Sequence, residues 1–190
     1  NKLAFTRGSR CQKMKKELRI KYRLIRQGKA HLDPLVNANL FKLVEKYSKI
    51  SLYISMKNEV NLESLINKLL LSKEIYFPAV DKELRFHRLY KWSDLTYDKA
   101  KILAPIHNEE VEVSYLDAVV MPCIAANKAG YRLGYGAGYF DRALAHYQGI
   151  KIGVLIEDCL IEEHFEESFD VQLDYIVTEK AIYEIEKKGQ

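Results

Sequence analysis

The sequence is poor in the residues that build disulfide frameworks and metal clusters. It contains 3 cysteines, at positions 11, 123 and 159, and this odd number of widely separated residues excludes a disulfide framework. The pattern indicates a reducing compartment. No two cysteines have the spacing of a zinc site, and the 5 histidines form no His-x-x-x-His pair. We therefore expect a cytoplasmic protein whose cysteines and histidines serve packing or lie at the surface.

Long apolar runs are also missing. None approaches the roughly 20 residues that a membrane span needs, and the first residues lack the apolar stretch of a signal peptide. The 48% of hydrophobic and 29% of charged residues are ordinary for a soluble globular protein. A chain of 190 residues has the size of one domain. The sequence therefore predicts a single domain over residues 1–190.

Positive charge is concentrated at one end of the chain. Residues 1–30 hold eleven of the 30 Lys and Arg residues and one acid, Glu17, whereas the remaining residues are net acidic. A basic N-terminus on an acidic body indicates an anionic partner near that end, which is a nucleotide, a polyanionic substrate or nucleic acid. For most of the individual charges, a solvated helix face is the simpler interpretation.

The apolar pattern alternates between helices and strands. Helical spacing predicts a basic helix over about residues 12–28, Asp33-Pro34 is typical of the start of a second helix, and Asn61 can cap a third. Strands are predicted at 50–54, 74–80, 84–90, 116–121, 151–156 and 175–177, with 84–90 as an antiparallel excursion. The acidic stretch 162–167 has a helix-like pattern.

This alternation favours an α/β fold with a mostly parallel sheet. We expect a three-layer α/β/α domain, with a Rossmann-like open sheet and helices on both faces. Ligands of such sheets bind beyond the C-terminal ends of the strands. The segments after 50–54 and after 116–121 both lie at such ends, so they are candidates for one cleft.

Residues 130–142 hold four of the nine glycines, together with three tyrosines, two arginines and an aspartate. Such a cluster needs a reason, because glycine costs backbone entropy. Phosphates bind to glycine-rich loops through backbone N–H groups, often where a helix begins, and a helical pattern over 139–147 follows here. The segment therefore indicates an anion-binding loop. It matches neither the Walker A nor the dinucleotide pattern, and no Gly-x-Ser-x-Gly elbow occurs.

The string Arg-Leu-Gly-Tyr-Gly-Ala-Gly-Tyr-Phe-Asp-Arg at 132–142 resembles the signature Arg-Leu-Gly-x-Gly-x-Gly-Tyr-Tyr-Asp of the 5-formyltetrahydrofolate cyclo-ligase family. Three other stretches are similar to motifs of that family. Lys15–Arg19 is similar to its Lys-x-x-Leu-Arg, Asn58-Glu59-Val60 to its Asn/Asp-Glu-Val/Ile, and Asp170–Asp174 to its Asp-x-x-Leu-Asp. The four matches keep their order and spacing over about residues 13–180, which is nearly the whole chain.

The resemblance implies an ATP- and Mg²⁺-dependent conversion of 5-formyltetrahydrofolate to 5,10-methenyltetrahydrofolate, with release of ADP and phosphate. In the mechanism that it implies, the formyl oxygen attacks the γ-phosphate, N10 of the folate attacks the phosphorylated carbon, and phosphate leaves. The implied partners are ATP and a folate with or without a polyglutamate tail. We expect a monomer that binds neither nucleic acid nor a membrane.

The resemblance also implies residue roles. The residues that would bind ATP are Lys15, Lys16, Arg19, Arg132, Leu133, Gly134, Tyr135, Gly136, Ala137, Gly138, Tyr139 and Phe140. Those that would bind the folate are Ile54, Glu59, Tyr135, Gly136, Ala137, Gly138 and Tyr139. Asp141 and Asp174 would hold Mg²⁺, which prefers one or two carboxylates beside phosphate oxygens and water. Arg132 and Tyr139 would be catalytic.

Other interpretations remain open at this stage. Without the resemblance, Glu59 is a surface acid before a helix, Asp141 an acid in the first turn of its helix, and Asp174 a turn residue. The chain also departs from the family pattern, because Ala137 stands where glycine or lysine is common and Phe140 replaces a tyrosine. A diverged relative without the reaction is one alternative. A basic nucleic-acid-binding module is another, although no RNP-like aromatic motif lies on a predicted strand.

Overall fold

The computed structural model describes residues 2–187, and it describes side chains from residue 10 onward. Residues 1 and 188–190 of the predicted domain, and the side chains of the basic residues Lys2 and Arg7, lie outside this range. The helices are α1 (Lys2–Arg26), α2 (Asp33–Val44), α3 (Glu63–Leu69) and α4 (Tyr139–Ala143). Short 3₁₀ turns are η1 (Ala30–Leu32), η2 (Trp92–Asp94), η3 (Val113–Tyr115) and η4 (Glu157–Cys159).

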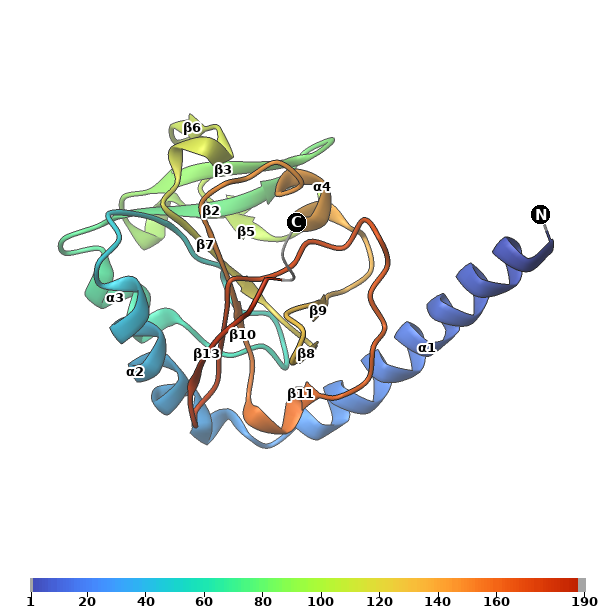
Figure 1. Ribbon diagram of the computed structural model, residues 1–190. Helices are drawn as coiled ribbons and strands as arrows, with labels where there is room; N and C mark the ends of the chain where they lie inside the picture. The colour runs from blue at the N-terminus through green and yellow to red at the C-terminus, as the bar shows by residue number, and fades with distance from the viewer. Residues whose placement is uncertain (1, 188–190) are drawn as a thin grey trace.

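An eight-stranded sheet forms the centre of the molecule, in the order β13-β12-β10-β7-β1-β2-β3-β6 (Figure 1). Its strands are β1 (Lys49–Ser51), β2 (Glu74–Val80), β3 (Leu84–Leu89), β6 (Glu110–Val111), β7 (Ala118–Pro122), β10 (Ile150–Val154), β12 (Tyr175–Val177) and β13 (Ile182–Glu184). The five strands from β12 to β2 pair in parallel. β13, β3 and β6 pair antiparallel at the two ends of the sheet. This arrangement confirms the mostly parallel sheet and the antiparallel excursion.

Two small sheets extend this framework. One joins β8 (Ala125–Asn127) to β9 (Arg132–Leu133) and to β11 (Leu160–Ile161), and the other pairs β4 (Thr96–Tyr97) with β5 (Leu103–Ala104). The antiparallel β8–β9 pair leads directly into the glycine-rich loop. The loop therefore begins on a paired strand and ends on α4, which fixes both of its ends.

Helices cover both faces of the central sheet. α2 and α3 pack on one side, and α1 and α4 lie on the other (Figure 1). α2 buries Val36, Leu40 and Val44. The central strand β7 is buried over Ala118–Met121, because a parallel strand that is covered on both faces has no solvent side. The expected α/β fold with helices on both faces is therefore confirmed.

Several predicted boundaries need correction. The basic helix predicted over 12–28 begins at Lys2 and ends at Arg26, because Gly8 and Ser9 weaken a helix without forbidding it. The helix predicted over 139–147 ends at Ala143. Tyr147 lies in a turn instead, and its hydroxyl donates a hydrogen bond to Leu116 O at 2.9 Å.

The acidic stretch 162–167 forms no helix. Its carboxylates make long-range contacts instead: Glu166 accepts a hydrogen bond from the Asn127 amide, and Glu167 pairs with Lys15. Asp33 also acts differently from expectation, because its side chain does not cap α2 but pairs with Arg26. Asn61 Oδ1 accepts from Glu63 N at 2.8 Å, which agrees with a helix start there.

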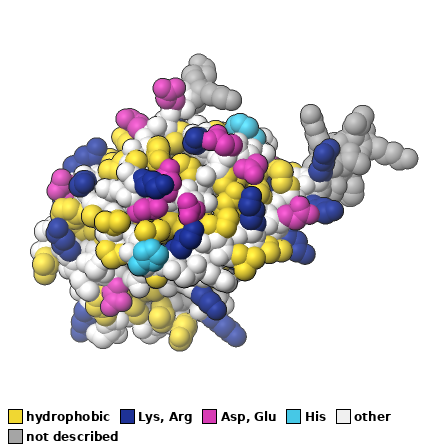
Figure 2. Space-filling model, turned by 90° about the horizontal axis from the view of Figure 1, so that it is seen from below, with side chains coloured by type: hydrophobic (Ala, Val, Ile, Leu, Met, Phe, Trp, Pro, Cys, Tyr) yellow, Lys and Arg dark blue, Asp and Glu magenta, His cyan; other side chains and the backbone are white. Residues whose placement is uncertain are grey.

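Charged side chains of both signs share the surface. Figure 2 shows Lys and Arg side chains interspersed with acidic and apolar ones on the face that it displays. In the described residues, no helix combines the length and the apolar character that crossing a membrane requires.

Candidate active site

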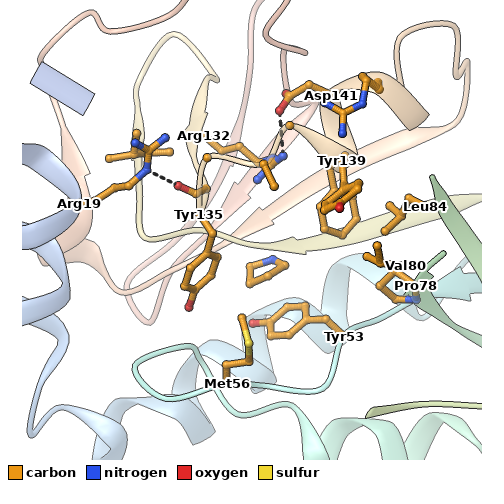
Figure 3. Close-up of a pocket in the computed structure, with 18 of the residues that line it drawn as sticks. Arg19, Tyr53, Met56, Pro78, Val80, Leu84, Arg132, Tyr135, Tyr139 and Asp141 are labelled. Carbon is orange, nitrogen blue, oxygen red and sulfur yellow. Dashed lines mark hydrogen bonds and ion pairs between the residues drawn. The ribbon is translucent and has the colours of Figure 1, made fainter. Parts of the chain in front are cut away.

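A cavity of about 670 Å³ opens at one edge of the central sheet. Tyr53 and Ile54 follow β1, Pro78 and Val80 lie in β2, and Pro122 ends β7, and all five line the cavity. The cavity therefore lies at the C-terminal ends of three neighbouring parallel strands, where α/β sheets bind their ligands. α1 and the glycine-rich loop form its opposite wall (Figure 3).

The structure brings nearly all of the predicted site residues to this cavity. The ones that line it are Lys15, Lys16, Arg19, Ile54, Glu59, Arg132, Leu133, Gly134, Tyr135, Gly136, Ala137, Gly138, Tyr139, Phe140 and Asp141. They come from α1, from the segment after β1 and from the loop before α4, which are far apart in the sequence.

Asp174 is the exception. It precedes β12, at the N-terminal end of a strand that is parallel to β10 and β7, so it lies at the other edge of the sheet. Its carboxylate accepts from Lys151 N at 2.7 Å and lies 2.6 Å from Lys187 Nζ. The expectation that Asp174 shares a metal with Asp141 is therefore corrected: Asp174 belongs to an ion-pair cluster outside the cavity.

The glycine-rich loop lies in close contact with Arg19. Arg19 Nε donates a hydrogen bond to Gly134 O at 2.7 Å. Gly136 has a φ of +102°, and a Cβ there would lie 3.2 Å from the Arg19 guanidinium. Gly138, with a φ of +69°, immediately precedes α4. The glycines thus give the loop a backbone that other residues rarely adopt, and they bring it against a cation.

Arg132 and Asp141 connect the two ends of this loop. Arg132 Nη2 lies 3.2 Å from Asp141 Oδ2, and the Arg132 guanidinium lies 5.1 Å from the centre of the Phe140 ring (Figure 3). Asp141 Oδ1 also accepts from Val171 N at 3.2 Å. Phe140 thus packs against the arginine. The exposed Arg142, 5.1 Å from the Tyr139 ring, supplies a cation beside the loop that Ala137 does not.

Lys15 is held between two acids that the sequence patterns did not predict as site residues. Its Nζ lies 2.8 Å from both Glu167 Oε2 and Asp170 Oδ2. Burial lowers the pKa of Lys15, but the hydrogen bonds to Asp170 and Glu167 outweigh this effect, and the pKa lies above its ordinary value. Lys15 is therefore a cation at the cavity wall. Asp170 was the first residue of the Asp-x-x-Leu-Asp motif, which is the signal that could have identified it.

Glu59 lines the cavity and carries a buried carboxylate. The residue is 7% exposed, and its Oε2 accepts from Met56 N at 2.7 Å. Oε1 has no hydrogen-bond partner among the described residues. Burial raises the pKa of Glu59, and the hydrogen bond from Met56 N and the nearby Tyr135 hydroxyl oppose this effect. A buried polar atom without a partner is costly, so a ligand with donors is the natural partner of this oxygen.

Aromatic and aliphatic side chains form the rest of the wall. Tyr135 and Tyr53 face each other across the cavity, and Tyr139 lies beside Val80 and Leu84 (Figure 3). Ile102 and Leu103 complete this apolar side. The cavity therefore combines an apolar wall with the carboxylate of Glu59 and a cationic loop. That combination fits a ligand pair with an aromatic ring and a polyanion.

Comparison with known proteins identifies the family. The model of the family described as "5-formyltetrahydrofolate cyclo-ligase family" matches residues 7–179. The chain belongs to this family of enzymes.

Relatives agree with this membership over most of the chain. A 5-formyltetrahydrofolate cyclo-ligase of Mycoplasma genitalium is 30% identical over 156 residues, which are 78% of this chain and 85% of the relative. The Escherichia coli K12 cyclo-ligase is 28% identical over 145 residues, 71% of this chain and 80% of the relative. The predicted family membership is thereby confirmed.

Solved structures of cyclo-ligase relatives share the fold. The NMR structure of 5,10-methenyltetrahydrofolate synthetase from Aquifex aeolicus has a TM-score of 0.82 and 31% identity, and it covers 93% of this chain and 95% of its own. The synthetase structure from Mycoplasma pneumoniae has a TM-score of 0.72 and 26% identity. The match covers 87% of this chain and 98% of the synthetase chain.

Proposed function

We propose that this protein closes 5-formyltetrahydrofolate to 5,10-methenyltetrahydrofolate and consumes ATP in doing so. One observation carries the proposal: a single cavity joins the free carboxylate oxygen of Glu59 to the cationic glycine-rich loop. The first feature suits the pterin end of a folate, and the second suits a triphosphate. Family membership supports the same reaction.

The folate is recognised at the Glu59 side of the cavity. A pterin ring carries an amino group and a ring N–H side by side, and a carboxylate accepts hydrogen bonds from both. Oε1 of Glu59 is free for this purpose. Ile54 and the ring of Tyr135 line the cavity nearby, so they would contact the ring faces.

The triphosphate is bound at the other side, by α1 and the loop. Lys15, Lys16 and Arg19 approach from α1, and Arg132 approaches from β9. Backbone N–H groups between Gly134 and Phe140 add donors that carry no net charge. Several donors of this kind neutralise phosphate charge without covalent chemistry, which is the main requirement of phosphoryl transfer.

The residues present also fit a Mg²⁺ ion, although the described residues contain no cluster of three or more His, Cys, Asp or Glu that would hold a metal unaided. Asp141 lines the cavity at the end of the loop, and Asp170 is adjacent to Val171, whose N–H donates to Asp141. We propose these two aspartates as the protein ligands, in place of Asp174. Mg²⁺ would supply charge neutralisation of the phosphates, and phosphate oxygens would complete its ligands.

The reaction follows from these placements. The formyl oxygen attacks the γ-phosphorus of ATP, the bond to ADP breaks, and the oxygen becomes part of a good leaving group. N10 then attacks the formyl carbon, its proton is lost, and the C–O bond breaks to release phosphate. Arg132 and Tyr139 are the residues that we assign to the transferred phosphoryl group, and Asp141 keeps Arg132 in place through their ion pair.

We also propose that residues 1–190 act as one cyclo-ligase domain, as a monomer in the cytoplasm, without nucleic acid or membrane partners. The test mixes the purified protein with 5-formyltetrahydrofolate, ATP and Mg²⁺ and follows the absorbance of the methenyl product. The chromophore should appear only when ATP is present. A folded protein that binds both compounds and forms no chromophore would support the diverged relative instead, and binding of nucleic acid that ATP does not displace would support the nucleic-acid module.

A further inference from the structure

A buried ion pair connects the first two helices. Arg26 is the last residue of α1, Asp33 is the first residue of α2, and their Nη2 and Oδ1 atoms are 2.5 Å apart. The two side chains are 7% and 9% exposed. A charge pair at this depth is a weak source of stability, because desolvation offsets much of the attraction. Stability alone is therefore a poor explanation for the pair of Arg26 and Asp33, and we look for a functional one.

Both members of the pair also contact the segment that carries Glu59. Arg26 Nη2 donates to Glu59 O at 3.1 Å, and Asp33 Oδ2 accepts from Asn61 N at 3.1 Å. Between these contacts, the hydroxyl of the buried Tyr53 donates to Val60 O at 3.0 Å. Three successive backbone groups of residues 59–61 are thus fixed from outside the segment.

Few bonds within the segment hold this conformation, although Val60 is buried and the Asn37 amide donates to Asn61 O at 2.9 Å. These internal bonds are confined to one turn, in which Glu59 N donates to Met56 O at 3.1 Å and Met56 N donates to Glu59 Oε2. Asn58 has a φ of +71°, a left-handed conformation that asparagine adopts more readily than most residues with a side chain. The bond from Arg26 to Glu59 O is an external contact at the residue that carries the carboxylate, so it helps to hold this turn in place.

We infer that Arg26, together with Asp33, is a positioning residue for the folate-binding carboxylate of Glu59. Arg26 touches the Glu59 backbone and does not line the cavity, so it acts through Glu59. The same helix carries Lys15 and Arg19 at the triphosphate side, so α1 sets the distance between the two substrate sites. The identity of the ligand rests on the proposed function, whereas the positioning itself does not.

Kinetics separate positioning from general destabilisation. In Arg26→Gln, the KM for 5-formyltetrahydrofolate should rise about tenfold, which corresponds to about 1.4 kcal/mol, while the KM for ATP stays near its wild-type value. Arg26→Lys keeps the charge but cannot direct a planar fork at both acceptors, so its KM should be intermediate. Lys151→Gln is the matched control, because Lys151 is similarly buried in an ion pair with Asp174 outside the cavity. It should lower Tm without changing either KM.

A second readout needs no ligand. Amide hydrogen exchange at Met56 and Glu59, which reports the turn that holds the carboxylate, should accelerate in Arg26→Gln and stay unchanged in Lys151→Gln. If Arg26→Gln does not fold, Arg26→Lys and Asp33→Asn provide the same measurements. Unchanged exchange in the folded variants, or equal changes in both KM values, overturns the inference. A wild-type protein without methenyl formation would refute the proposed function alone, since the exchange measurement still tests the positioning.

Discussion

The guanidinium of Arg132 lies 3.2 Å from the carboxylate of Asp141, across the ends of the glycine-rich loop. In the proposed function, the pair would place a cation beside the phosphates and an anion beside Mg²⁺. Each group orients the other through this contact. The ion pair therefore joins the two ends of the loop.

Asp141→Asn tests the metal assignment. The amide cannot supply the negative charge, so kcat at limiting Mg²⁺ should fall on the order of 100-fold, and higher Mg²⁺ should recover part of it. Initial rates over a range of Mg²⁺ concentrations measure this effect. Asp174→Asn is the control, because Asp174 lies outside the cavity and its rate should stay close to wild type. Equal losses in both variants would restore Asp174 as a ligand and contradict our assignment.

Glu59→Gln tests folate recognition. Replacing one oxygen of the carboxylate with an amide removes the charged acceptor, and hydrogen bonds to charged groups contribute about 1.5–3 kcal/mol. The dissociation constant of 5-formyltetrahydrofolate should therefore rise at least about tenfold, whereas that of ATP should not change. Calorimetric titration with each compound separates the two. A Glu59→Gln variant that binds the folate as tightly as wild type would refute the role of Glu59.

The same carboxylate predicts a pH dependence of stability. Burial raises the pKa of Glu59 in the folded state, so the group favours folding below its unfolded value. That contribution is lost as the pH rises through the folded pKa, at about 1.4 kcal/mol for each unit of elevation. Ligand-free Glu59→Gln should therefore have a higher Tm than wild type at neutral pH and no advantage at pH values below the unfolded pKa. A lower Tm at neutral pH would contradict this sign.

Gly136→Ala separates loop geometry from stability. The added methyl would meet the Arg19 guanidinium, and φ at Gly136 is +102°. Gly28→Ala is the matched control, because Gly28 also has a positive φ of +74° but a Cβ there meets nothing within 4 Å. Both variants should lose about 1 kcal/mol of unfolding free energy, and only Gly136→Ala should raise the KM for ATP. A comparable rise in Gly28→Ala would show that the effect is general.

Lys15→Met tests the cation on α1. Removing the ammonium takes one donor from the triphosphate and leaves Glu167 and Asp170 without their cation. The dissociation constant of ATP should rise about tenfold or more. Lys13→Met is the control, since Lys13 is exposed on the same helix and does not line the cavity. If ATP affinity falls equally in both variants, Lys15 contributes only through its net charge, and the proposed direct contact is wrong.

The local motifs could be predicted from the sequence because they are short and carry their own chemistry. The glycine cluster indicates a loop with an unusual backbone conformation, and the basic residues of α1 indicate a positively charged N-terminal region. Parallel strands were predictable from their apolar runs. The family resemblance, together with the position of both segments after strand ends, led to the prediction that Glu59 and Arg132 share a site.

Contacts made over long sequence distances could not be predicted. The apolar wall depends on β2 meeting β3 and β5, which no local pattern specifies. Asp174 and Asp170 are four residues apart in one motif, and only the sheet shows that the first lies at the far edge and the second in the cavity. The acidic stretch that ends at Glu167 has a helix-like local pattern. Its pairing with Lys15 is a long-range contact, which a local pattern does not reveal.

The most direct test of the proposed reaction follows one oxygen atom. If the formyl oxygen attacks the γ-phosphate, 5-formyltetrahydrofolate labelled with oxygen-18 in its formyl group should give unlabelled methenyltetrahydrofolate and inorganic phosphate that carries the label. One ADP should form for each methenyl product. Mass spectrometry of the phosphate reads the result. Label that appears in water while phosphate stays unlabelled would contradict a phosphorylated formyl intermediate, and with it the role that we assign to Arg132 and the glycine-rich loop.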